Sequence, residues 1–160
     1  MISNVKIREN IKKDLRTYYP AILETYKHFA SKTHKDSQVF LSYNDVWEFL
    51  LAIDVVDNKT FSKHDYDPIF RAVNFSDADE PLNPDHGVVR YEFVETLVRV
   101  AIEKFKVKGS CKTEDEAVKT LICEILAPKM EEWDQGRWRS TRYLTENMEI
   151  VFRTYMPVFQ

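Results

Sequence analysis

The sequence predicts an all-α fold, on three observations. The chain of 160 residues contains only 3 glycines, whereas the many tight turns of β-sandwiches and barrels depend on glycine. Apolar residues recur at helical spacing in several separate segments. Two short β-prone stretches, Gln38–Leu41 and Gly87–Arg90, interrupt that pattern just before helix starts. They are too short to form a sheet alone, so we expect them to pair as a two-stranded bridge.

The first helical pattern contains a proline. Leu15, Tyr19, Ile22 and Tyr26 recur at steps of three and four residues, which is the spacing of one helix face. Pro20 lies inside this run, and proline suits a first turn but breaks a helix interior. We therefore expect one helix to end near Tyr19 and a second to start with Pro20.

Two further helices are predicted in the middle of the chain. The apolar stripe of the first consists of Tyr43, Val46, Trp47 and Leu50. Ser42 precedes it and suits an N-cap. The stripe of the second consists of Tyr66, Ile69, Phe70 and Val73. This second helix has two possible starts. Ser62 with Asp65 forms one capping pattern, and Asp67 followed by Pro68 forms another.

The C-terminal half predicts three more helices. The clearest runs from Tyr91 to about Lys106, with a wide apolar face. Thr113 followed by Glu116 forms a capping-box pattern for the next helix, which continues to Pro128. The apolar stripe of the last helix consists of Leu144, Met148, Val151 and Tyr155.

Composition and charge limit the classes of partner and the cellular locations that we expect. Basic and acidic residues number 23 and 26, for a net charge of −3, so overall charge gives no reason to expect nucleic acid. The first helix carries a basic run that we interpret as a solvated face: Lys6, Arg8, Lys12, Lys13 and Arg16. The two cysteines suit a reducing compartment. Without a signal peptide or an apolar run of about 20 residues, we expect no membrane partner and a cytoplasmic or cytoskeletal location.

Residues 20–106 are predicted to contain two successive units, each consisting of a helix, a loop with a short strand, and a second helix. This plan resembles an EF-hand pair of the calmodulin-like superfamily, whose two loops pair through one short β-bridge. In EF-hands a strand hydrophobe is followed four residues later by the ligating Glu and then by a Phe, and Val88, Glu92 and Phe93 fit these places. The resemblance implies an EF-hand-like fold in which Glu92 occupies a ligand position.

A second resemblance suggests a setting for the domain. The run 91–104, together with Ile69-Phe70-Arg71-Ala72 in the preceding helix, is similar to the EF-hand-like repeats of large ciliary and flagellar proteins in protists. This similarity implies a protein partner in the cytoskeleton, such as an axonemal component of a cilium or flagellum.

The second loop departs from the calcium-binding pattern at two positions. Counting back from Glu92, the first position is Pro81, which has no side-chain oxygen, and the sixth is His86, where glycine makes the sharp turn. The candidate calcium ligands in this loop are Asp77, Asp79, Asp85 and Glu92. Two interpretations are open: a non-standard calcium site, or an empty acidic surface loop in which Glu92 favours the helix dipole. We favour the empty loop.

The first loop is poorer in ligands. With Leu41 as its strand hydrophobe, the first, third, fifth and twelfth positions are His34, Asp36, Gln38 and Asp45. Two carboxylates fall short of the six to eight or so oxygens that calcium takes. We therefore expect this loop to bind no metal.

Tryptophan and arginine gather before the last helix. Trp133 and Trp138 lie on either side of Arg137, and protein interfaces favour both residue types. One interpretation is a partner-binding segment formed by Trp133, Arg137 and Trp138. The other is that the tryptophans cover the core from a returning segment.

The two ends of the chain share a pattern. A shift of 129 positions aligns Leu15 with Leu144, Tyr19 with Met148, Ile22 with Val151, Leu23 with Phe152, Thr25 with Thr154 and Tyr26 with Tyr155. Any two amphipathic helices share such spacing, but the matched Thr-Tyr favours a repeat. We expect one domain over 1–160, with a core pair at about 20–106 and flanking helices at 5–18 and 113–158. The last helix either closes the fold or starts a second repeat.

The expected function follows from an EF-hand-like fold whose loops lack a full set of calcium ligands. The sequence has no phosphate loop, no nucleophile elbow and no metal-ligand spacing of His and Cys, so we expect no enzyme. We expect a non-enzymatic interaction module of a cytoskeletal assembly, with degenerate EF-hands and no cofactor. The alternative is a calcium sensor or buffer that uses the second loop.

Overall fold

A computed structural model describes residues 2, 4–33, 40–57, 59–75, 87–134, 137, 139–143 and 145–159. Over these residues the chain is all-α with a two-stranded antiparallel bridge, as predicted. The first elements are α1 (Val5–Thr33), β1 (Leu41–Ser42), α2 (Tyr43–Ala52), α3 (Lys63–Val73), β2 (Gly87–Val88) and α4 (Arg90–Ala101). The π-helical η1 (Ile102–Val107), α5 (Glu114–Lys119), the π-helical η2 (Thr120–Leu126), α6 (Ala127–Met130) and the short η3 (Glu131–Trp133) follow. The last are the π-helical η4 (Arg139–Tyr143), α8 (Glu146–Tyr155) and the short η5 (Met156–Phe159).

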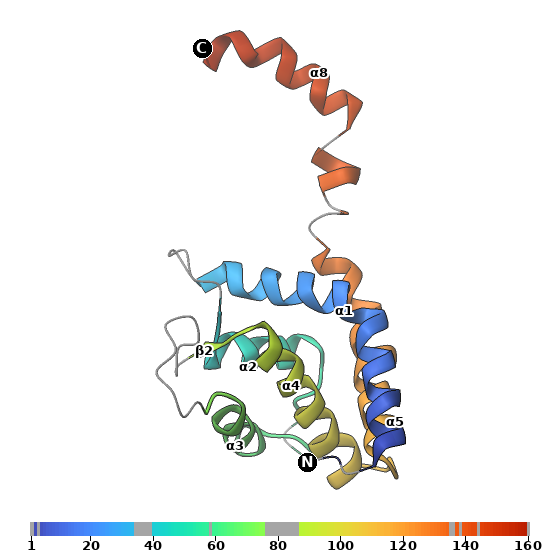
Figure 1. Cartoon of the computed structure of the whole chain (residues 1–160). Helices are drawn as coiled ribbons and strands as arrows, with labels where there is room; N and C mark the ends of the chain where they lie inside the picture. The colour runs from blue at the N-terminus through green and yellow to red at the C-terminus, as the bar shows by residue number, and fades with distance from the viewer. Residues whose placement is uncertain are drawn as a thin grey trace.

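Helix α1 continues through Pro20, so the predicted break near Tyr19 is wrong. The proline still has an effect, because α1 consists of two straight runs that meet in a sharp bend (Figure 1). Pro20 explains the bend, since it lacks the N–H that would bond the carbonyl of Arg16 and its ring presses on that carbonyl. The helix changes direction instead of ending.

The bend lets α1 pack in two directions. Its first run lies beside α5, where Asn10 Nδ2 donates to Asp115 Oδ2 at 2.6 Å (Figure 1). Its second run packs on α2 and α4, and the ring centroids of Phe29 and Phe49 are 5.4 Å apart. Helix α1 is therefore shared between the strand-bridged part of the fold and the returning C-terminal segment.

The two predicted strand segments do pair. In the bridge, Leu41 lies opposite Val88 and Ser42 lies opposite Gly87. Residues 38–39 of the first predicted strand lie outside the described residues, and Phe40 precedes β1 without belonging to it. The bridge joins two halves: the first half is the second run of α1 with β1 and α2, and the second half is α3 with β2 and α4.

Side-chain caps decide where several helices begin. Helix α3 follows Ser62, whose backbone N–H donates to Asp65 Oδ2 at 2.9 Å, so the first of the two predicted starts is the observed one. Pro68 consequently lies inside α3. Thr113 Oγ1 accepts the N–H of Glu116 at the start of α5, as predicted.

The C-terminal segment first packs along α1 and then leaves the body of the protein, by which we mean the helices from α1 to α6 together with the bridge. Helices α5 and α6 contact α1, and Lys129 Nζ donates to the carbonyl of Ala52 at the end of α2 at 2.9 Å. Helix α8 projects away from the body (Figure 1), and none of its residues is buried. None of the helices that the structure describes has the 18-residue apolar stretch that crossing a bilayer requires.

Candidate functional site

The strand bridge brings the two candidate loops to equivalent positions. Leu41 and Val88, the predicted strand hydrophobes of the two loops, lie opposite each other and are fully buried. Four residues after them stand Asp45 in α2 and Glu92 in α4. These two acidic residues are only 4% and 3% exposed. The site therefore consists of two buried carboxylates at equivalent places in the two halves.

Asp45 caps the start of α2. Its Oδ2 accepts the backbone N–H of Ser42 at 2.8 Å, and Ser42 Oγ accepts the backbone N–H of Asp45 at 3.3 Å. This reciprocal pair satisfies two donors that a helix start otherwise leaves without partners. Asp45 is thus engaged in holding the helix start.

Glu92 has the same task at the start of α4. Its Oε2 accepts the backbone N–H of Val89 at 3.0 Å. Val89 has no side-chain oxygen, so it cannot return a bond to the N–H of Glu92 as Ser42 does in the first half. A negative side chain in this first turn also interacts favourably with the helix dipole.

Of the four candidate calcium ligands, the structure places only Glu92. Asp77, Asp79 and Asp85 lie outside the described residues. Within the parts of the chain that are described, no three His, Cys, Asp or Glu side chains gather closely enough to hold a metal ion. A calcium ion at Glu92 would share its carboxylate with the Val89 N–H, since a carboxylate offers about four lone-pair sites.

Two buried tyrosines join the halves. Tyr26 of α1 donates to the carbonyl of Val88, and Tyr66 of α3 donates to the carbonyl of Tyr43, each at 3.3 Å. Each hydroxyl crosses from one half to the other. Burial raises the pKa of Tyr26 to about 12, and burial raises the pKa of Tyr66 as well. Both hydroxyls therefore stay protonated donors at neutral pH.

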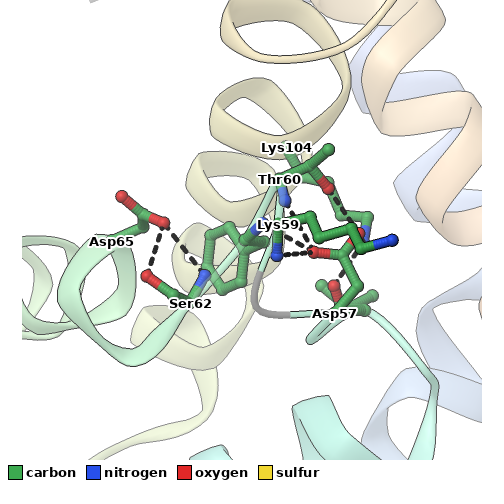
Figure 2. A network of polar contacts seen from close by, with 8 residues as sticks. Asp57, Lys59, Thr60, Ser62, Asp65 and Lys104 are labelled. Carbon is green, nitrogen blue, oxygen red and sulfur yellow. Dashed lines mark hydrogen bonds and ion pairs between the residues drawn. The ribbon is translucent and has the colours of Figure 1, made fainter.

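Asp57 shapes the connection between α2 and α3 (Figure 2). Its Oδ1 accepts the backbone N–H groups of Lys59, Thr60 and Phe61 at 3.0, 2.7 and 3.0 Å. The hydroxyl of Thr60 donates to Oδ2 at 2.5 Å. The Thr60 hydroxyl first, and then these backbone bonds, hold the pKa of the Asp57 carboxyl well below its usual range. Asp57 is therefore an ionised anchor for this turn.

Two lysines after α4 hold the same connection. Lys104 of η1 is 9% exposed, and its Nζ donates to the carbonyl of Val55 and to Asp57 Oδ2, the latter at 3.1 Å (Figure 2). Lys108 Nζ lies 2.5 Å from Asp65 Oδ1, and its hydrogen bond lowers the pKa of Asp65 to about 2. We call Asp57, Asp65, Lys104 and Lys108 the connector clamp, because they tie the α2–α3 connection and the first turn of α3 to the end of the α4–η1 helix.

The residues predicted to bind a partner lie in different environments. Trp133 packs on the core, with its ring centroid 5.3 Å from that of Phe29. For Trp133 this arrangement matches the alternative interpretation, a tryptophan that covers the core. Arg137 is exposed and pairs with Glu131, and Trp138 lies outside the described residues.

A cavity of about 440 Å³ lies between α3 and the α4–η1 helix. Its lining consists of His64, Asp65, Pro68, Ile69, Arg99, Ile102 and Glu103. Asp65 belongs to the connector clamp, and Arg99 Nη2 donates to Glu95 Oε1 at 2.7 Å. Two of its four ionisable side chains are thus paired within the protein, and the lining holds no nucleophile beside a base.

Sequence reasoning missed the connector clamp and the crossing hydroxyls. Asp57 begins a turn-forming run, which is a signal that could have found it. Lys104 is 47 positions away from Asp57 and looks like one of several bases on an amphipathic helix. Tyr26 and Tyr66 fit the apolar stripes, but spacing does not say which distant carbonyl their hydroxyls reach.

Comparison with known proteins gives no basis for assigning a family. No family model, no curated protein and no solved structure matches the chain. The function is therefore proposed from the sequence patterns and the geometry.

Proposed function

We propose that the chain is a non-enzymatic protein-interaction module whose EF-hand-like pair keeps one conformation without calcium. One observation carries the proposal: Asp45 and Glu92, which stand where an EF-hand pair offers its twelfth ligands, both accept a backbone N–H at a helix start. The pairing of Leu41 with Val88 supports the EF-hand-like part, because both are the expected strand hydrophobes.

The connector clamp supports a static pair. A calcium sensor changes the angle between its helices and exposes an apolar groove. Here the buried Lys104 bonds both Asp57 and the carbonyl of Val55. Removing one partner of a buried charge is strongly destabilising, so any motion that separates η1 from the α2–α3 connection has to break these bonds first.

The cytoskeletal setting is the second element of the proposal. It is supported by the similarity of 91–104 and its preceding helix to the repeats of ciliary and flagellar proteins. Proximity labelling in the source cell, with this chain fused to the labelling enzyme, should mark axonemal or other cytoskeletal proteins. Labelling confined to membrane or nuclear proteins would contradict the setting.

A calcium titration separates the proposal from the calcium-sensor alternative. Tryptophan fluorescence and binding of an apolar dye are followed from micromolar to millimolar calcium, with magnesium as the control ion. We expect neither signal to change, because Pro81 and His86 replace two features of a high-affinity loop. Micromolar calcium binding that Glu92→Gln abolishes and the matched Asp45→Asn retains would overturn the proposal.

A further inference from the structure

The first run of α1 presents a strongly basic surface. Five exposed bases lie within the eleven positions 6–16. We call them the basic face: Lys6, Arg8, Lys12, Lys13 and Arg16. Glu9 is the exposed acid among them, and Asp14 is half-buried. Val5 and Tyr19, which are 63% and 46% exposed, lie at the two ends of this surface.

Partners within the protein do not account for the basic face. Glu9 pairs with Lys12 at 2.9 Å, and the pKa of Glu9 is lowered chiefly by Lys12, with smaller contributions from two other bases of the face. The ion pairs of the described residues include none of the remaining four bases. On the neighbouring α5, Asp115 bonds Asn10 rather than a base of this face.

The basic face does not stabilise α1 either. The first turn of α1 contains no acidic residue, although the positive end of the helix dipole lies there and disfavours cations. Arg8, Lys12 and Arg16 follow one another at intervals of four residues, and like charges at this spacing repel. Apart from the pair of Lys12 with Glu9, the bases of this face form no ion pair among the described residues, so their placement is better explained by binding of an external anion.

We propose that the basic face binds an Asp- and Glu-rich segment of a partner protein. The inference rests on the proposed role as an interaction module and names the chemistry of the partner. At a rise of 1.5 Å per residue the face is about 17 Å long, which matches roughly five residues of an extended peptide. The guanidinium groups of Arg8 and Arg16 suit carboxylates, because each can make two parallel hydrogen bonds to one carboxylate.

A short acidic segment suits this surface better than a long polyanion does. The whole chain has a net charge of −3, so a nucleic acid would also meet acidic surface beyond the basic face. A short peptide interacts with the basic face alone, because charges more than about 8 Å away are screened at physiological salt. A bilayer binds helices that can insert an apolar side, and here Ile11 on that side is only 6% exposed.

Fluorescence anisotropy of a labelled deca-glutamate peptide tests the proposal, and we expect saturable binding that weakens as salt is raised. The test variant neutralises three bases of the face: Arg8→Gln, Lys13→Gln and Arg16→Gln. It should weaken binding by about tenfold or more, because it removes three charge-assisted contacts. Its melting temperature should be unchanged or higher, and a lower one would show that these bases stabilise the fold instead.

The matched control makes the same change in net charge at exposed bases elsewhere: Lys59→Gln, Arg71→Gln and Arg90→Gln. It should weaken peptide binding by about twofold or less. Equal losses in the two triple variants, absence of peptide binding, or tighter binding to a DNA duplex or to phosphatidylserine vesicles would each overturn the inference. The calcium titration reports on the EF-hand-like pair and not on the basic face. A negative peptide result would therefore overturn this inference and leave the proposed function intact.

Discussion

Two helical segments of this chain share one sequence pattern and differ in what covers them. The second run of α1 and helix α8 align by a shift of 129 positions, with Ile22 matched to Val151 and Tyr26 matched to Tyr155. In α1 these residues are 1% and 2% exposed, whereas in α8 they are 45% and 58% exposed. The pattern specifies an apolar face, and the partners of the helix decide whether that face is buried.

The two segments are accordingly stabilised by different interactions. The second run of α1 is held by tertiary contacts from β2, α2 and α4. Helix α8 has local interactions, namely the Thr145 cap that accepts the N–H of Met148 and the pair of Arg153 with Glu149 at 2.6 Å. Because short isolated helices are marginal in water, substitutions in the two segments should have very different effects on global stability.

The largest effect is expected at Tyr26. Tyr26→Ala removes a ring whose centroid is 5.7 Å from that of Phe93, and it should lower the free energy of unfolding by about 4 kcal/mol. Chemical denaturation followed by circular dichroism measures this loss. Tyr26→Phe is the matched control and should cost only about 1 kcal/mol, because it removes the bond to Val88 and keeps the ring. Equal losses would mean that the ring contributes little.

Trp133 should show the next largest effect. Trp133→Ala leaves a gap beside Phe29 and should cost roughly 3 kcal/mol, which lowers the melting temperature by about 6–12 °C in a chain of this size. Thermal unfolding measures the change. An unchanged melting temperature with weaker partner binding would instead make Trp133 an interface residue, as the sequence alone also allowed.

Caps provide a third test of the difference between buried and exposed helices. Glu92→Ala leaves the N–H of Val89 without its acceptor and should lower the free energy of unfolding by about 1–2 kcal/mol. Glu92→Gln keeps an acceptor oxygen and should cost less. Thr145→Ala removes the cap of α8 and should leave the global transition unchanged. A comparable loss in Thr145→Ala would show that α8 is coupled to the body.

Acid should weaken the body through the connector clamp. The pKa of Asp65 is lowered from 3.8 to about 2 in the folded chain, so its contribution to stability is complete above about pH 4 and is lost as the pH falls toward 2. Denaturation at several pH values in this window measures the loss. Asp65→Asn should be less stable at neutral pH and should show a shallower pH dependence. An identical pH profile in the variant would remove Asp65 from this role.

The smallest effect is expected in α8. Tyr155→Ala should change the free energy of unfolding by less than about 0.5 kcal/mol, because its side chain is exposed. The same denaturation experiment measures it beside Tyr26→Ala. A loss of several kcal/mol would show that α8 packs on the body in solution and that the two segments are alike in burial as well as in pattern.

Local patterns predicted most of the fold, because local physics determines those features. Helical spacing located α2 and α4, and the capping residues Ser62 and Thr113 marked helix starts. The bridge followed from two short β-prone runs. The break at Pro20 was wrong because the local penalty for proline competes with packing on both runs of α1, and sequence spacing does not report that packing.

The candidate site was predictable only in part. Glu92 was found as the twelfth residue of a loop pattern, but its role as a cap for Val89 depends on the backbone path of the helix start. The connector clamp joins residues 47 positions apart. Such a contact is set by how helices cross in space, so no local window of the sequence contains it.

The contact between α1 and α5 also has a consequence for folding during synthesis, because the two helices are translated at different times. The first run of α1 emerges from the ribosome before α5, because the α5 residue that bonds Asn10 follows it by 105 positions. At about 5–20 residues per second, translation supplies that partner about 5–20 s later. During this interval the nascent chain exposes the apolar side of α1, including Ile11. Each new molecule therefore passes through a period in which chaperone binding or premature self-association competes with folding.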